Sequence, residues 1–333
     1  MRILVGTDAW RPQVNGVVRT LTTMLPEVEK LGHRVTVVSP DLFASLPCPF
    51  YSEIRLALGV GRRLDALVEE ARPDAIHLAT EGPIGYALRR WCLRRGRRFT
   101  TAYHTRFPEY LAARYVMPAR LTYALLRRFH APAAAIMVAT ETMRGALKGR
   151  GFGNLRHWGR GVDPALFHPA ARDDGIGFPR PIFLSVGRIA REKNLPAFLG
   201  LDLPGSKLVV GEGPQLESLR RQFPAAHFLG RVEHGALARL YASADVFVFP
   251  SRTDTFGLVL LEALASGTPV GAFPVPGPLD VIGDSEAGVL DQDLRRAALR
   301  ALDISRAECR RHALEFTWAE CAQQFIDQLS PDL

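Results

Sequence analysis

Short apolar runs alternate with longer amphipathic segments along the whole 333-residue chain. Apolar runs bounded by Gly, Pro or Asp are typical of buried parallel strands, and apolar residues that recur every three or four positions are typical of helices. Their alternation predicts an α/β fold with parallel sheets built from strand–helix–strand units. The predicted strands span residues 3–6, 34–38, 75–78, 99–102 and 135–138 in the first half, and 182–186, 207–210, 227–229, 246–249 and 270–273 in the second.

The alternation stops between residues 160 and 180, where RGVDPALFHPAARDDGIGFPR has neither a helical nor a strand period. A segment rich in Pro, Gly and Asp is typical of a linker. We therefore predict two Rossmann-like domains facing each other across a cleft, residues 1–165 and 166–312, followed by a last segment, 313–333. That segment begins with ALEFTWAECAQQFIDQL, whose apolar residues share one side of a helix predicted over 313–329.

The composition is that of a soluble globular protein, with 47% hydrophobic residues and no apolar run as long as the ~18 residues of a membrane-spanning helix. The start, MRILVGTDAW, enters a predicted strand at once, so we expect no signal peptide. Cys48, Cys92, Cys309 and Cys321 are far apart and form no C-x-x-C pair. This spacing argues against a disulfide framework or a zinc site and favours a cytoplasmic setting.

The net charge of +8 is unevenly shared, because residues 1–165 carry 25 Lys and Arg against 13 Asp and Glu, whereas residues 166–333 carry 17 against 21. A basic first half favours an acidic partner, and anionic lipid headgroups would contribute about 1 kcal/mol per well-placed basic side chain. The alternative is an ordinary solvated, arginine-rich face. Nucleic acid is not expected, because the basic runs lack interleaved aromatic residues. The densest basic positions are Arg89, Arg90, Arg94, Arg95, Arg97, Arg98, Arg114, Arg120, Arg127 and Arg128.

The segment VFVFPSRTDTFGLVLLEALASGTPV, residues 246–270, carries the most chemistry. A strand ends at Pro250, Asp254 follows in a polar turn, a helix is predicted to begin near Phe256, and Glu262 comes eight residues after Asp254. A helix N-terminus attracts phosphate, and Gly257 lets a ligand approach the backbone closely. The two carboxylates on either side of this phosphate site could bind the hydroxyl groups of the same ligand. The pattern therefore favours a nucleotide-sugar. The alternative is an Asp that only caps its helix.

Four other loops follow predicted strands. Arg188 and Lys193 lie five residues apart across a strand-to-helix turn, where both cations can hold one diphosphate, or can be plain surface charges. Gly16 opens an amphipathic helix that ends at Gly32, which suits either a phosphate or simply a helix entry that needs a small residue. His104 follows the strand 99–102, where a loop hydrogen-bonding role is the alternative to catalysis. The Gly211-x-Gly213 pair is explained equally well by a tight turn.

In chain order, the segments PQVNGVVRT, AYHTRFPEY, SVGRIAREKNL, FLGRV, TDTFGLVLLEA and FTWAECAQQF resemble the retaining GT-B glycosyltransferases of family 4. The resemblance covers nearly the whole chain and implies a GT-B fold whose last helix crosses back onto the first domain. The pair Asp254 and Glu262 is similar to the family's acid-x7-acid motif, which usually has Glu at its first position. Asp254 keeps the negative charge of that Glu, but its side chain is one methylene shorter, so its carboxylate oxygens lie nearer to the backbone.

The resemblance also implies the roles of the site residues, with no cofactor and no metal. Glu262 is expected to bind the donor ribose, Asp254 and the Phe256 backbone the sugar hydroxyls, and His104 the far side of the sugar ring. The remaining donor contacts are assigned to Arg188, Lys193, Gly187 and the backbone of Gly16, Gly257 and Leu258 at the diphosphate, and to the backbone of Arg231 and Val232 at the nucleobase.

PQVNGVVRT and TDTFGLVLLEA resemble most the branch that glycosylates diacylglycerol and the related α-mannosyltransferases. We therefore expect a hexose to pass from a nucleotide-sugar, preferably a UDP-sugar, to a membrane lipid such as diacylglycerol, with the enzyme peripheral on the inner face of the cytoplasmic membrane. One alternative is a soluble or polysaccharide acceptor, with GDP-mannose as a possible donor. Two other classes are a GT-B sugar-nucleotide epimerase and a basic, non-catalytic binding module.

Overall fold

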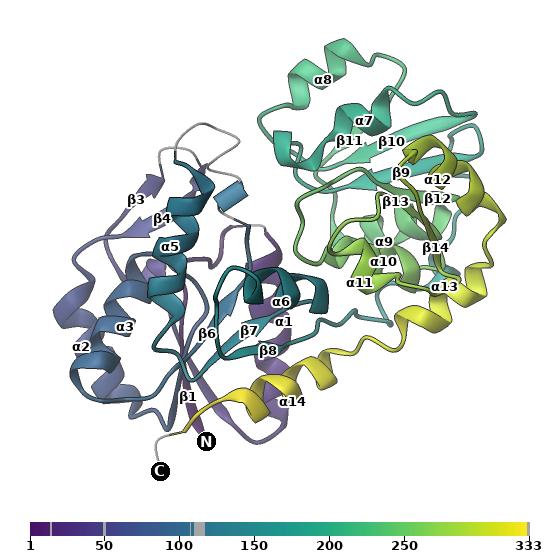
Figure 1. The fold of residues 1–333 in the computed structure, drawn as a ribbon. Coiled ribbons are helices and arrows are strands. Elements are labelled where there is room, and N and C mark those ends of the chain that lie inside the picture. The colour runs from purple at the N-terminus through teal and green to yellow at the C-terminus, as the bar shows by residue number, and fades with distance from the viewer. Residues whose placement is uncertain (14, 49–50, 107, 110–116, 332–333) are drawn as a thin grey trace. The chain divides into compact units, whose positions relative to one another are not determined.

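The chain folds into two compact units, Met1–Arg160 together with Trp318–Leu333, and Gly161–Thr317 (Figure 1). The computed structural model describes residues 1–13, 15–48, 51–106, 108–109 and 117–331, with only the backbone of 51–54. The first segment of the first unit ends at Arg160, five residues before the boundary predicted at residue 165. Of the positions quoted above, Val14, Phe107, Tyr110 and Arg114 lie outside the described residues.

The first unit is built on a six-stranded parallel sheet in the order β2-β1-β5-β6-β7-β8. The prediction of five parallel strands is confirmed, with shifts of one residue at two of them. The sixth strand, β8, was not predicted because its three residues, Leu155–His157, contain a single apolar side chain. The other strands are β1 (Arg2–Gly6), β2 (Arg34–Val38), β5 (Ala75–Leu78), β6 (Thr100–Tyr103) and β7 (Ala135–Val138).

Helices cover both faces of this sheet because successive strand residues point to opposite sides. Ile3 and Val5 face one buried cluster, and Leu4 faces the other. The first cluster lies under α1 (Gly16–Lys30) and α14 (Trp318–Gln328), and the second under the remaining helices. These are α2 (Val60–Ala71), α3 (Pro83–Arg94), α5 (Ala119–His130) and α6 (Glu141–Lys148), and an unpredicted antiparallel pair, β3 (Ser45–Cys48) and β4 (Tyr51–Ala57), precedes them.

The second unit repeats the design with a parallel sheet in the order β11-β10-β9-β12-β13-β14. All five of its predicted strands are present, and the added edge strand is β14 (Gly288–Leu290). The five are β9 (Ile182–Val186), β10 (Ser206–Val210), β11 (His227–Gly230), β12 (Val246–Phe249) and β13 (Val270–Ala272). The helices are α7 (Leu195–Leu199), α8 (Leu216–Gln222), α9 (His234–Ser243), α10 (Leu258–Ala265), α11 (Pro278–Val281), α12 (Leu294–Arg300) and α13 (Arg306–Ala313).

The single helix predicted over 313–329 is wrong at its beginning. Helix α13 ends at Ala313 and α14 begins at Trp318, so residues 314–317 break the predicted helix. The backbone of this break pairs with another part of the chain. Phe316 O accepts a hydrogen bond from Val162 N at 3.1 Å, and Thr317 forms a parallel β-bridge with Val162. The break also divides the predicted last segment, because residues up to Thr317 belong to the second unit and only Trp318 onwards to the first.

Candidate active site

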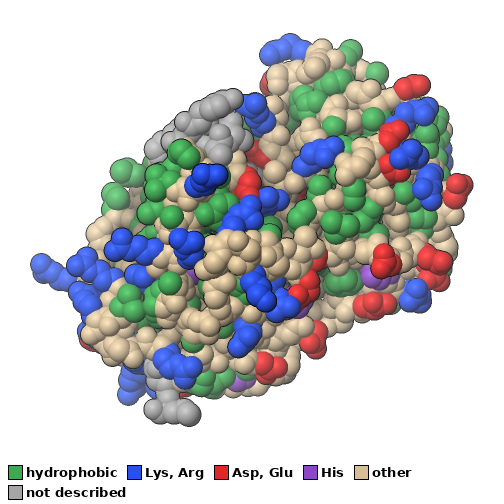
Figure 2. All heavy atoms as spheres, viewed as in Figure 1, with side chains coloured by type: hydrophobic (Ala, Val, Ile, Leu, Met, Phe, Trp, Pro, Cys, Tyr) green, Lys and Arg blue, Asp and Glu red, His purple; other side chains and the backbone are tan. Residues whose placement is uncertain are grey.

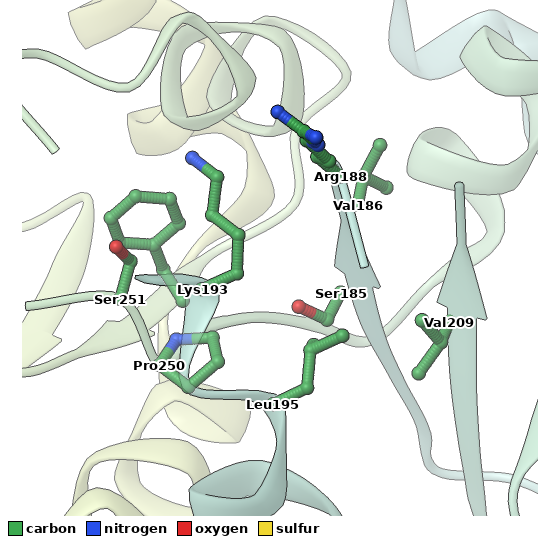
Figure 3. A pocket seen from close by; sticks show the side chains of 10 residues that line it. Ser185, Val186, Arg188, Lys193, Leu195, Val209, Pro250 and Ser251 are labelled. Carbon is green, nitrogen blue, oxygen red and sulfur yellow. The ribbon is translucent and has the colours of Figure 1, made fainter. Parts of the chain in front are cut away.

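A pocket opens in the second unit where the strand order reverses. Strand β9 is followed on one side by β10 and on the other by β12, and such a switch point is where doubly wound sheets bind ligands. The β9–β12 ladder contains only Val246 with Phe183 and Phe247 with Leu184, so the two strands separate toward their carboxyl ends. The lining residues are Ser185, Val186, Gly187, Arg188, Lys193, Leu195, Val209, Phe249, Pro250 and Ser251 (Figure 3).

The predicted site residues Gly187, Arg188 and Lys193 line this pocket, and Asp254 is hydrogen-bonded to Lys193. Arg188 and Lys193 both line it, and in Figure 3 their nitrogen-bearing ends extend to the same side. Lys193 Nζ donates to Asp254 Oδ1 at 2.5 Å. The second carboxylate oxygen, Oδ2, is buried and accepts no hydrogen bond from the described residues. Asp254 therefore fixes the position of Lys193 and keeps one oxygen for another donor.

The two loops of the site are joined by hydrogen bonds from residues that the sequence analysis missed. Asn194 has a φ of +52°, in the left-handed region that Asn tolerates, and its Nδ2 donates to Pro250 O at 3.0 Å. Glu192 O accepts from the hydroxyls of Ser251 and Thr253, each at 3.3 Å. An Asn directly after Lys193 was the available signal, and its partner 56 residues away could not be identified from spacing.

Helix α10 begins two residues later than predicted, at Leu258. Its N-cap residue, Gly257, has a φ of +87° and no side chain caps the helix, so the N–H groups of the first turn meet no competing side-chain acceptor. Glu262 lies on the second turn and is 3% exposed. The side chain of Phe256 is buried.

The Gly211-x-Gly213 pair packs against the Arg188 turn. A Cβ on Gly211 would come 1.9 Å from Gly187 O, and one on Gly213 would come 2.3 Å from Ile189 O. Backbone bonds hold the turns together, with Ile189 N donating to Glu212 O at 2.8 Å. The pair thus positions the loop of the site. Arg231 and Val232 follow β11, and neither lines the pocket.

Gly16 and His104 belong to the first unit, where each follows a strand of that sheet. At the start of α1, Asn15 Oδ1 accepts from Val17 N and Val18 N, both at 3.0 Å. This cap occupies two donors that the phosphate prediction for Gly16 would use. The start of α3 is occupied in the same way, since Asp8 Oδ1 accepts from Ile84 N at 2.9 Å. Burial raises the pKa of Asp8.

His104 lies beside a buried arginine. Its Nδ1 is 3.3 Å from a guanidinium nitrogen of Arg160, and its ring stands edge-on to Trp158 with the ring centroids 5.6 Å apart. Burial and the charge of Arg160 hold the pKa of His104 well below its usual value, so the imidazole is neutral at physiological pH. Among the described residues no group of three His, Cys, Asp or Glu side chains is arranged to hold a metal.

Models of two protein families match this chain. Residues 14–166 match Glycosyltransferase Family 4, and residues 180–303 match the group 1 glycosyl transferases. The chain belongs to the family 4 glycosyltransferases. Among the relatives of this glycosyltransferase, the GDP-mannose-dependent alpha-mannosyltransferase of Mycobacterium tuberculosis is 32% identical over 87% of this chain and 83% of its own. The alpha-monoglucosyldiacylglycerol synthase of Streptococcus pneumoniae is 30% identical over 94% and 81%.

The solved structures confirm the fold of this glycosyltransferase. Sucrose-phosphate synthase from Thermosynechococcus elongatus superposes with a TM-score of 0.79 over 98% of this chain and 97% of its own, at 21% identity. The predicted α/β GT-B fold, with two Rossmann-like domains, is therefore confirmed, and helix α14 belongs to the first unit as a GT-B fold implies. Within the described residues, the glycosyltransferase has no helix long and apolar enough to cross a bilayer.

Proposed function

We propose that this glycosyltransferase moves a hexose from a nucleotide diphosphate sugar to a lipid hydroxyl, such as that of diacylglycerol, with retention and without a metal. The observation that carries the donor half is the placement of Arg188, Lys193 and Asp254 at the switch point of the second sheet. Guanidinium and ammonium groups suit phosphate oxygens, and the uncapped start of α10 adds backbone N–H donors.

In the proposed reaction, Arg188, Lys193 and the N-terminus of α10 stabilise the negative charge that grows on the leaving diphosphate. These fixed positive groups take the place that a metal ion fills in other transferases. Asp254 orients the sugar through Oδ2, Glu262 binds the ribose hydroxyls, and His104 supports the sugar ring. The acceptor hydroxyl attacks the anomeric carbon from the face that the diphosphate leaves. Its proton passes to a phosphate oxygen of that leaving group.

The acceptor half rests on the surface of the first unit and on one relative. The relative from Streptococcus pneumoniae is named a monoglucosyldiacylglycerol synthase. Lys and Arg side chains gather over the first unit in Figure 2, and helix α5 adds exposed Leu121 and Leu125 beside exposed Arg127 and Arg128. Cationic and apolar side chains on one helix suit an anionic bilayer surface. We place the reaction at the cytoplasmic face of the membrane.

The donor is tested by the thermal stability of the protein in EDTA with UDP-glucose, UDP-galactose, GDP-mannose or ADP-glucose. A ligand at one hundred times its dissociation constant stabilises by about 2.7 kcal/mol, a readily measured shift. A shift with UDP-sugars supports the preferred donor, and a shift with GDP-mannose supports the donor named for the mycobacterial relative. No shift with any donor contradicts the proposed site.

The acceptor is tested with the donor so identified, radiolabelled in its sugar, and vesicles that contain diacylglycerol. Extraction of the label into the lipid phase supports the proposal, and NMR of the product shows whether the anomeric configuration is retained. Soluble mannosides and an acceptor-free reaction serve as the comparison. Transfer only to the soluble sugar contradicts the lipid acceptor and leaves the donor site intact.

A further inference from the structure

Arg160 is a buried cation whose position needs an explanation. It follows β8, ends the segment Met1–Arg160 of the first unit and is 5% exposed. Its NH1 donates to the carbonyls of Trp158 and Gly159, each at 2.7 Å, and the guanidinium carbon lies 4.3 Å from the centroid of the Trp158 ring. Burial lowers the pKa of Arg160 to about 10, which still leaves it charged at neutral pH.

No carboxylate of the described residues lies within ion-pair distance of Arg160. A buried charge without a counter-ion costs several kcal/mol of desolvation, which carbonyl dipoles and an aromatic face offset only in part. A glutamine or methionine would fill the space more cheaply. The cation therefore serves a purpose other than stability.

The geometry at His104 indicates that purpose. A guanidinium group has donors and no acceptor, so His104 Nδ1, 3.3 Å from Arg160 NH2, can only accept. A neutral imidazole carries one N–H, and with Nδ1 accepting, that hydrogen must be on Nε2. Arg160 also repels a second proton on the ring.

The other titratable groups whose charges act on His104 work in the same direction. His77 of β5 and His130 of α5 both disfavour a charge on His104. His130 Nε2 is itself 3.2 Å from Glu81 Oε1. On α14, Cys321 donates to Gly159 O at 3.2 Å, and burial raises the pKa of its thiol to about 11, so it stays neutral.

We infer that Arg160 is a positioning residue that holds His104 as a neutral hydrogen-bond donor through Nε2. This rests on the proposed function, in which His104 contacts the donor sugar, and it specifies the contact: His104 donates to a sugar oxygen and neither removes nor supplies a proton. Because Nδ1 is blocked by a permanent cation, the imidazole keeps this one form across the range in which a free histidine titrates.

The test uses the full chain labelled with ¹⁵N-histidine, and His104→Gln to assign the His104 signals. In the wild type we expect an unprotonated Nδ1 and a protonated Nε2 at every pH from 5 to 8. In Arg160→Gln we expect His104 to exchange between tautomers and its pKa to rise, because the charge of Arg160 is removed while burial still lowers that pKa. Arg160→Lys keeps a cation and is expected to keep most of the wild-type behaviour.

Activity provides the second readout. The wild-type kcat is expected to show no pH limb from His104, whereas in Arg160→Gln kcat is lower because part of the neutral His104 population lacks the hydrogen on Nε2. The matched control is Arg310→Gln, because Arg310 also donates to backbone carbonyls, those of Phe167, Ala265 and Pro164, but in the second unit. We expect it to leave the His104 spectrum and the shape of the pH profile unchanged.

A wild-type spectrum with a proton on Nδ1, or with titration near pH 6.5, overturns the inference, as does an Arg160→Gln spectrum identical to that of the wild type. If Arg160→Gln does not fold, the wild-type spectrum and the spectrum of Arg160→Lys still test the inference. A failure of the proposed function looks different: the His104 spectra behave as expected, and no donor supports transfer.

Discussion

At the scale of single residues, the proposed donor site depends most on the ion pair of Lys193 and Asp254. Its partners come from two loops that also share hydrogen bonds through Asn194 and Glu192. Removing one member of a mostly buried pair leaves the other charge without compensation, so the two side chains act as a unit. A bound donor diphosphate would therefore share Lys193 with Asp254. Because Asp254 already holds this lysine in place, the diphosphate would not have to order a freely moving, solvated side chain.

Lys193→Ala is therefore expected to lower turnover by about two to four powers of ten, the scale found for other preorganised electrostatic groups. The donor dissociation constant should rise as well, because the diphosphate loses a cation. Steady-state kinetics and donor titration measure both effects. The matched control is Lys207→Ala. Lys207 lies at the amino-terminal end of β10, where it donates to the backbone carbonyls of Leu199 and Leu201. A Lys193→Ala protein with normal turnover would refute the assigned role.

Residues of this kind could be predicted from the sequence where each stands close after the end of a predicted strand. Arg188, Lys193 and Asp254 were predicted for this reason, and in the structure Arg188 and Lys193 line one pocket while Asp254 pairs with Lys193. Asn194 and Arg160 were missed because their partners, Pro250 and His104, are each 56 residues away in the sequence. No spacing rule connects such distant positions.

A second residue-scale expectation concerns the buried His77. Its Nδ1 bonds Thr100 Oγ1 at 2.9 Å, its ring stands edge-on to Phe325, and burial lowers its pKa to about 3. Above pH 6.5 both folded and unfolded chains hold it neutral. Below that pH only the unfolded chain binds the proton, so the free energy of unfolding falls by up to about 1.4 kcal/mol per pH unit until the pH reaches about 3.

His77→Gln removes the group that takes up this proton on unfolding. The slope of the unfolding free energy against pH, below pH 6.5, should therefore decrease by the amount that corresponds to about one proton. Urea unfolding at pH 7.5, 6 and 5 measures the slope, and tryptophan fluorescence reports on the first unit alone, since Trp10, Trp91, Trp158 and Trp318 all belong to it. His104 contributes in the same direction and remains in both proteins. Equal slopes for the two proteins would exclude His77 as the source.

At the scale of elements, the helices differ in whether a side chain caps their N-terminus. Those of α1 and α3 are closed by Asn15 and Asp8, whereas α10 starts at a glycine with no side-chain cap. Strand positions were predictable from apolar runs, since a buried strand must be apolar on both faces. Caps supplied by a distant residue, such as Asp8 on α3, could not be predicted, because the capping residue lies more than seventy positions away.

Helix α5 is the element that we propose contacts the membrane. Leu121 and Leu125 lie one turn apart on it and are 51% and 44% exposed. Burying one leucine side chain in a bilayer surface contributes about 1.5–3 kcal/mol. Leu125→Glu should therefore weaken binding to phosphatidylglycerol vesicles at low salt by more than about tenfold, as measured by co-sedimentation.

The matched control for that variant is Leu314→Glu, since Leu314 is 45% exposed and lies after α13 in the second unit. It is expected to bind vesicles as the wild type does. Phosphatidylcholine vesicles separate the contribution of charge from that of the leucines. Equal loss with both variants, or no binding of the wild type to anionic vesicles, would remove the support for a lipid surface at α5.

At the scale of the whole molecule, the two units are joined at residues 160–161 and 317–318, and the chain runs beside itself there through Val162 and Thr317. A two-domain α/β protein was predictable from the repeated strand pattern. The place of the last helix came from the family resemblance, because an amphipathic helix fits many apolar faces. The structure makes α14 part of the first hydrophobic core, where Cys321, Phe325 and Leu329 pack with residues of α1 and β1.

The first unit should therefore fold only with α14. Residues 1–160 alone would expose Trp158, whose indole Nε1 donates to Cys321 O at 3.1 Å and whose ring lies 5.5 Å from that of Phe325. We expect this fragment to be aggregated or non-cooperative in urea, and the same fragment joined to residues 318–333 by a Gly/Ser linker to unfold cooperatively by tryptophan fluorescence. Phe325→Ala in the fusion should cost about 3–5 kcal/mol. Cooperative unfolding of residues 1–160 alone would show that α14 is an accessory to that core, since the sheet and its other helices would then suffice.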